Sequence, residues 1–121
     1  GDFNRLGEIA TQIKENQLFI INVDHHIPKD ESVYNISIVD SKAPATTYMC
    51  WKYYQFLGMT KNKLDDKIAF PLYVGLVNDT GSFRYEGVTS ETHKMASHLL
   101  LSNINPNNVK FHFQQRLNAT A

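Results

Sequence analysis

The chain has 121 residues and a mass of 13.9 kDa, which suits one ordinary domain and is too small for two enzyme domains. Its 42% hydrophobic and 20% charged residues exclude a disordered or fibrous chain. Twelve basic residues balance twelve acidic ones, so the sequence lacks the positive excess with which proteins grip a nucleic-acid duplex. Its apolar runs are far shorter than the ~18 residues of a membrane helix. Because the single cysteine, Cys50, suits a reducing compartment, we expect a cytoplasmic protein without a membrane span.

The first 26 residues predict a helix, then a strand, then a polar triplet. Apolar residues recur at helical spacing and predict an amphipathic helix over residues 3–15. The run LFIINV at residues 18–23 is apolar and rich in β-branched side chains, as in a strand covered on both faces. Asp24, His25 and His26 follow it directly. Ligands of open α/β sheets bind beyond the carboxyl ends of strands, so the triplet lies where a site is expected.

The next segment predicts a more exposed strand and a helix. Alternating apolar residues over residues 34–40 favour the strand. Ser41 and Pro44 are typical of a helix start, and Gly58 is typical of the residue that follows a helix end. Between them lies a broad apolar stripe: Ala45, Tyr48, Met49, Phe56 and Leu57, with Trp51 and Tyr53 beside it. We interpret this stripe as core packing and not as an aromatic binding surface.

Residues 71–78 allow two interpretations, because their apolar spacing fits a helix while LYVGLV taken alone fits a strand. Pro71 would kink the helix or remove one hydrogen bond from the strand. A further helix is expected from Thr89 or Ser90, with an apolar face of Met95, Ala96, Leu99 and Leu100. A last helix is expected from Pro106, with Val109, Phe111 and Phe113 as its apolar contacts. The predicted fold class is α/β, with a mostly parallel sheet flanked by helices.

Two groups of residues are candidates for a functional site. Asp24, His25 and His26 combine carboxylate and imidazole, a mixture that suits a borderline divalent ion; the alternative is a solvated strand end. The second group is the Asn78–Ser82 turn, where Asp79 follows an apolar run and the small residues of the turn expose backbone amides that could hold an anion. Arg84 could reach a phosphate from there, and the alternative is an ordinary Asx turn. Three other histidines are expected to be surface or packing residues and not ligands: His93, His98 and His112. Cys50 is expected to be a small core residue and not a nucleophile.

Taken together, these groups and their flanks resemble the DHH phosphoesterase superfamily. The segments NVDHH, APATTYMCWKYY, YVGLVNDTGSFRYEGVTSET and MASHLLL occur in the order and at about the separations of the DHH domain. The branch concerned contains oligoribonucleases, pAp phosphatases and exopolyphosphatase-related proteins. The resemblance covers essentially the whole chain and favours a helix over residues 71–78.

The resemblance implies a site with two metal ions, usually Mn²⁺ with Mg²⁺ or Co²⁺ as alternatives, that hydrolyses phosphate esters or phosphoanhydrides. By the same resemblance His25 and Asp79 are metal ligands, and Asp24 is a ligand or supports the histidines. His26 is the catalytic residue that faces the scissile phosphate. Ser82 and Arg84 are weaker candidates for contacts with the substrate.

Some elements of the family have no counterpart in this chain: the first Asp-x-Asp motif, the aspartate that would precede Gly1, and the GGGH motif of the accessory domain. Residues 1–121 are therefore expected to form a partial DHH domain that is inactive alone. The expected substrates of the parent protein are short single-stranded oligonucleotides or small phosphorylated nucleotides, with cyclic dinucleotides, polyphosphate and pyrophosphate left open. A homodimer is one expected assembly. The alternative function is a DHH-like module that binds a nucleotide or a partner chain without catalysis.

Overall fold

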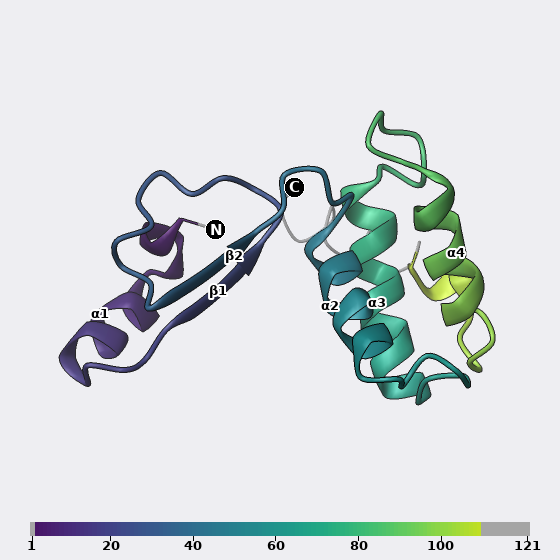
Figure 1. Cartoon of the computed structure of the whole chain (residues 1–121), viewed down its shortest axis with the longest axis horizontal. Coiled ribbons are helices and arrows are strands. Elements are labelled where there is room, and N and C mark those ends of the chain that lie inside the picture. Colours follow the sequence, from purple (N-terminus) through teal and green to yellow (C-terminus); the bar gives the residue numbers. More distant parts are fainter. Residues whose placement is uncertain (1, 110–121) are drawn as a thin grey trace.

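The computed structural model describes residues 2–109 and divides them into a small sheet with a helical arm and a layer of three helices (Figure 1). The elements follow in the order η1 Phe3–Leu6, α1 Glu8–Glu15, β1 Ile21–Asp24, β2 Ile36–Val39, α2 Thr46–Phe56, α3 Asp66–Asp79 and α4 Ser90–Leu99. The predicted α/β class with a parallel sheet is confirmed. The described part of the chain contains no helix long and apolar enough to cross a membrane.

The two strands pair in parallel, with Ile21 opposite Ile36 and Asp24 opposite Val39. Both strands are shorter than residues 18–23 and 34–40, over which they were expected. A parallel pair brings both carboxyl ends to the same edge of the sheet. This edge faces the start of α2, which contacts β1 (Figure 1).

Within residues 2–109 only one face of the sheet is covered, in contrast to the expectation for residues 18–23. Asn22 and Asp24 are 8% and 6% exposed, which places the polar side chains of β1 on its buried face. The four apolar side chains on the other face are between 38% and 56% exposed: Ile21, Val23, Ile36 and Ile38. We call these four residues the apolar sheet face.

The helix predicted over residues 3–15 is interrupted at Gly7. This residue has φ 58° and ψ −127°, a conformation that side chains with a Cβ rarely adopt. The chain therefore forms a 3₁₀ turn before Gly7 and the α1 helix after it. Helical spacing alone did not reveal this break, because the apolar pattern continues across the glycine.

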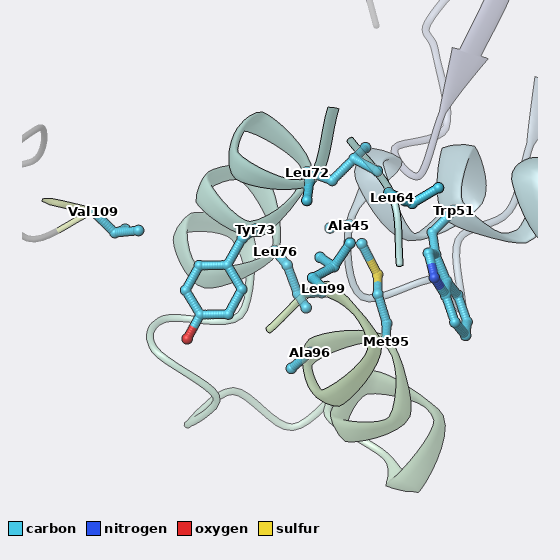
Figure 2. Close-up of a cluster of buried hydrophobic side chains, with 11 residues drawn as sticks. Ala45, Trp51, Leu64, Leu72, Tyr73, Leu76, Met95, Ala96, Leu99 and Val109 are labelled. Atoms are coloured by element: carbon cyan, nitrogen blue, oxygen red, sulfur yellow. The ribbon is translucent and has the colours of Figure 1, made fainter. Parts of the chain in front are cut away.

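The core lies between α2, α3 and α4 (Figure 2). Leu76, Met95 and Leu99 are fully buried there. Residues 71–78 are helical, which decides the ambiguity of the sequence, and Pro71 is tolerated inside α3 at an exposed position. Gly75 allows α2 to approach closely, because a Cβ on it would lie 2.3 Å from Cγ2 of Thr47.

The α2 helix begins at Thr46 and not at Ser41. Asp40 organises the preceding residues into a turn, since its Oδ1 accepts the backbone N–H of Lys42 and its carbonyl accepts that of Ala43. The helix ends as predicted, with Gly58 in a left-handed conformation at φ 77°.

The predicted stripe on α2 is only partly core. Trp51 is 4% exposed and its Nε1 donates to Nδ1 of His98 at 3.0 Å, which confirms His98 as a packing residue. Phe56 at the end of the helix is 85% exposed, so its assignment to the core is wrong. Tyr53 and Leu57 are also exposed.

The start of α4 is confirmed. Thr89 precedes the first residue of the helix, and its backbone N–H donates to Oγ1 of Thr92 at 3.0 Å. Leu100 is 43% exposed, in contrast to its predicted burial. Residues 106–109 are helical and Val109 is buried, as expected. The other residues predicted for this last helix lie outside the described residues: Phe111, His112 and Phe113.

Candidate metal centre

Three segments meet where the sheet joins the helical layer (Figure 1). The end of β1 contributes Asp24 and the two histidines after it. The turn before α2 contributes Ala43 and Thr46, and the last residue of α3 contributes Asp79. The three segments are far apart in sequence, so the fold itself assembles the centre.

Asp24 is the buried anchor of this centre. Its Oδ1 accepts the backbone N–H of His25 at 2.8 Å and that of His26 at 3.2 Å. The same oxygen lies 3.2 Å from Nδ1 of His26 and 3.3 Å from Oγ1 of Thr46. Burial raises the pKa of the Asp24 carboxyl, but its hydrogen bonds, those from His26 among them, outweigh burial and hold the pKa well below its ordinary value. Asp24 is therefore a carboxylate whose orientation is fixed by several donors.

Nε2 of His25 faces the carboxylate of Asp79. Its Nδ1 lies 3.1 Å from the carbonyl oxygen of Ala43, and since a carbonyl can only accept, Nδ1 carries the proton of the neutral ring. Nε2 is buried, lies 3.1 Å from Oδ2 of Asp79 and makes no hydrogen bond within the described chain. Two acceptors thus face each other, an arrangement that is unfavourable unless a proton or a cation lies between them.

Asp79 also stands at an unfavourable helix position. It is the last residue of α3, where the helix dipole is negative, and the last turn of α3 contains no basic residue. Asn78 partly compensates by donating from Nδ2 to Oδ1 of Asp79 at 3.1 Å. The second carboxylate oxygen remains beside His25, where a bound cation would remove both conflicts.

The donor set fits a divalent cation. Ligand atoms of Asp24, His25 and His26 lie within 4.8 Å of one another, and Asp79 is joined to them through His25. Imidazole nitrogen combined with carboxylate oxygen suits a borderline divalent ion. Ala43 and Thr46 act as the outer contacts that orient such ligands.

His26 differs from His25 in exposure. Its ring lies 4.0 Å from that of His25, but its side chain is 73% exposed. The contact between Nδ1 and Asp24 leaves Nε2 as the unprotonated nitrogen of the neutral ring. His26 can therefore contact a ligand at the surface of the centre while Asp24 holds it in place.

The structure brings together four of the six predicted site residues: Asp24, His25, His26 and Asp79. Ser82 and Arg84 lie exposed in the turn after α3, and the described contacts do not link their side chains to the other four. Nε of Arg84 donates to the carbonyl of Gly81 at 2.7 Å, so this side chain is held against its own turn.

Of the two interpretations of this turn, the anion site does not agree with the structure, because its backbone amides are not free. Five successive N–H groups are already used inside the turn, those of residues 81–85. Their acceptors are the carbonyls of Val77, Asn78 and Thr80 and the Thr80 hydroxyl. Gly81, Ser82 and Phe83 all have φ between 56° and 65°, so the chain winds in a left-handed turn that closes on itself.

Two contributors were missed from the sequence. Ala43 acts through its backbone carbonyl, and the identity of a residue carries no signal for such a role. Thr46 left a weak signal, since a threonine in the first turn of a helix near a predicted site can reach across to it.

Comparison with known proteins finds relatives of this chain. No family model matches the chain. It is 38% identical over 85 residues to a protein of Streptococcus mutans named probable bifunctional oligoribonuclease and PAP phosphatase NrnA, covering 70% of this chain and 26% of that protein. The bifunctional oligoribonuclease and PAP phosphatase NrnA of Thermus thermophilus is 33% identical over 82 residues, covering 68% and 24% respectively.

A solved structure shares the fold. The chain superposes on an exopolyphosphatase-related protein from Bacteroides fragilis with a TM-score of 0.76 and 22% identity, covering 88% of this chain and 31% of that one. The chain spans about a quarter of the length of the two curated relatives, since the matches cover 26% and 24% of those proteins. Together with the Asp24–His26 segment and the turn that begins at Asp79, these matches show that the chain belongs to the DHH family of phosphoesterases.

Proposed function

We propose that the chain supplies part of a metal-dependent phosphoesterase centre acting on short oligonucleotides or small phosphorylated nucleotides such as pAp. The observation that carries the proposal is the pair formed by Nε2 of His25 and Oδ2 of Asp79, which lie 3.1 Å apart, are both acceptors when the ring is neutral, and have no hydrogen bond between them in the described part of the chain. The relatives named as oligoribonucleases and PAP phosphatases support the substrate class. Because the chain spans only a quarter of their length, the reaction belongs to the protein that contains the whole centre.

The ion that fits the proposal is Mn²⁺, with Mg²⁺ or Co²⁺ as alternatives, and the complete centre would hold two ions. His25 and Asp79 would be direct ligands, and Asp24 a ligand or the support of both histidines. When bound, such ions polarise a phosphoryl oxygen and lower the pKa of water.

His26 is the residue that would face the scissile phosphate. Its Nδ1 contact with Asp24 fixes the ring, and its exposed side chain leaves room for a phosphate group beside the centre. A protonated Nε2 would donate to a phosphate oxygen, and the buried carboxylate of Asp24 would stabilise that protonated ring. Arg84 and Ser82 remain candidates for outer substrate contacts, since the turn that carries them follows Asp79 directly.

The experiment measures Mn²⁺ binding and phosphate release with the same preparations. Mn²⁺ binding by the chain is followed by electron paramagnetic resonance for the wild type, His25→Ala and Asp79→Asn, with Glu86→Gln as a control that removes one exposed charge outside the centre. We expect at least tenfold weaker binding in the first two variants and none of this loss in the control. A His25→Ala variant that binds Mn²⁺ like the wild type would contradict the assignment.

Phosphate release is then tested with pAp, a dinucleotide, tripolyphosphate and pyrophosphate. Turnover that disappears in His25→Ala would support catalysis and identify the substrate. Mn²⁺ and pAp binding without turnover would favour the second candidate function, a nucleotide-binding module without catalysis. The predicted homodimer and cytoplasmic location stay predictions; the apolar sheet face supports the first and the single, unpaired Cys50 supports the second.

A further inference from the structure

The turn after Asp79 carries an aromatic ring that rests on a glycine. A Cβ at Gly81 would lie between 2.3 and 2.7 Å from three ring atoms of Tyr85, so the ring occupies the space that a side chain at position 81 would fill. Tyr85 is nevertheless 60% exposed. The ring is thus supported by backbone on one side and open to solvent elsewhere.

The glycine under this ring is close to Asp79 of the candidate metal centre. Gly81 follows Asp79 by two residues, so their Cα atoms are at most ~7.6 Å apart. The loop between α3 and α4 stands at the same end of the helical layer as the start of α2 and the end of β1 (Figure 1). A ligand whose phosphate contacts the centre can therefore extend toward the ring.

The turn that supports Tyr85 is internally braced. The buried Thr80 hydroxyl donates to the carbonyl of Leu76 at 2.7 Å and accepts the N–H of Phe83 at 3.0 Å. The carbonyl of Thr80 accepts the N–H of Tyr85 itself at 3.0 Å. A ring held in this way loses little conformational entropy when a flat ligand binds to it.

Arg84 adds a cationic group to the same turn. Its Nε donates to the carbonyl of Gly81, the residue on which the ring rests, and its terminal nitrogens make no hydrogen bond within the described residues. Aromatic rings with neighbouring guanidinium groups bind single-stranded nucleic acids by stacking on bases and contacting phosphates. Inorganic polyphosphates offer no flat face to such a ring.

We infer that Tyr85 is a stacking surface for a nucleobase of the substrate and that it makes the centre selective for nucleotides over inorganic polyphosphates. The inference rests on the proposed function for the position of the phosphate. It adds Tyr85 to the residues that bind the substrate, and it explains a preference for nucleotides that metal ligands alone would not produce.

The test compares two ligands on three proteins in the presence of Mn²⁺. Calorimetric titrations with pAp and with tripolyphosphate are made on the wild type, Tyr85→Leu and Tyr85→Phe. Since stacking on one base contributes ~1–3 kcal/mol, we expect Tyr85→Leu to weaken pAp binding about tenfold and Tyr85→Phe to bind pAp within about threefold of the wild type. Tripolyphosphate binding should change less than about twofold in either variant.

Three results would overturn the inference: unchanged pAp binding in Tyr85→Leu, an equal loss for both ligands, or wild-type protein that binds tripolyphosphate and not pAp. Mn²⁺ binding is measured on each variant, so that damage to the centre is separated from loss of stacking. If the wild type does not bind Mn²⁺, the proposed function fails. The Tyr85 inference is then decided by titrating pAp without metal, where a loss in Tyr85→Leu still supports stacking and no loss refutes it.

Discussion

Replacing Asp79 by asparagine should stabilise the metal-free protein while removing its response to Mn²⁺. In the wild type, the Asp79 carboxylate faces Nε2 of His25, which carries no proton in the neutral ring, and stands at the negative end of α3. An asparagine amide has nearly the same shape, carries no charge and can donate to Nε2. The substitution therefore relieves both conflicts without a change of packing.

The magnitude follows from two contributions. A neutral hydrogen bond to Nε2 contributes ~0.5–1.5 kcal/mol, and removing a charge from a helix carboxyl end contributes ~0.3–1 kcal/mol. The sum is about 1–2 kcal/mol in the free energy of unfolding. In a domain of this size that raises Tm by roughly 4–8 °C.

Mn²⁺ should reverse the order of the two proteins. A ligand at about 100 times its Kd stabilises the folded state by ~2.7 kcal/mol, which exceeds the gain of the variant. Thermal unfolding is therefore measured at pH 8 in EDTA and in excess Mn²⁺, because ordinary histidines are neutral at that pH. Glu86→Gln is the matched control, since it removes one exposed carboxylate from the loop after the same helix.

The expected pattern is a higher Tm for Asp79→Asn in EDTA and a higher Tm for the wild type in Mn²⁺. An Asp79→Asn protein less stable than the wild type in EDTA would show that His25 and Asp79 form an ordinary ion pair. An equal rise of Tm with Mn²⁺ in both proteins would show that Asp79 is not a ligand of the ion.

Three further predictions concern the fold. Gly75→Ala should cost ~1–3 kcal/mol in unfolding by urea because its Cβ meets Cγ2 of Thr47, and adding Thr47→Ser should recover most of the loss; an unaffected single variant would refute the close contact. Burial raises the pKa of Tyr73, so the folded protein favours the neutral phenol. The stability that depends on this neutral phenol is fully present below pH ~10 and is lost as the pH rises above that value. Tyr73→Phe should therefore resist unfolding at pH 11 better than the wild type and match it at pH 7; equal alkaline loss would exclude Tyr73 as its source. Ile21→Thr combined with Ile36→Thr should weaken concentration-dependent self-association in sedimentation velocity, since both belong to the apolar sheet face; unchanged association would place the contact elsewhere.

The sequence predicted those features that depend on local chemistry. Thr89 before α4 and Gly58 after α2 were identified because caps and left-handed residues have strong local preferences. The Asp24–His26 triplet was a candidate site because polar residues directly after an apolar run have few structural explanations, whereas Asp79 became a predicted ligand only through the family resemblance; the structure places both groups together. The helix over residues 71–78 needed the family resemblance, since its apolar residues suit a strand equally well.

The features that the sequence missed depend on contacts between distant segments. Gly7 breaks a helix whose apolar spacing continues across it, and no neighbour in sequence signals this. An anion site was one of two interpretations of the small residues after Asp79, and the structure excludes it because the Thr80 hydroxyl and nearby backbone carbonyls accept the amides of this turn. The contact between His25 and Ala43 joins residues 18 positions apart and uses a backbone atom, which sequence patterns do not record.

The location of the centre has a consequence for the whole fold. Among the described elements the helical layer contacts the sheet chiefly through α2 and β1, whereas α3 supplies Asp79 from within the layer (Figure 1). The pair formed by His25 and Asp79 is thus a direct contact between the end of β1 and the end of α3, and with the neutral ring of His25 it is unfavourable unless a cation is bound. A cation bound by both residues would change this contact from repulsive to attractive and would join the two parts of the fold. Metal binding should therefore protect the amides of β1 and of the last turn of α3 together from hydrogen exchange, because one bound ion acts on both ends.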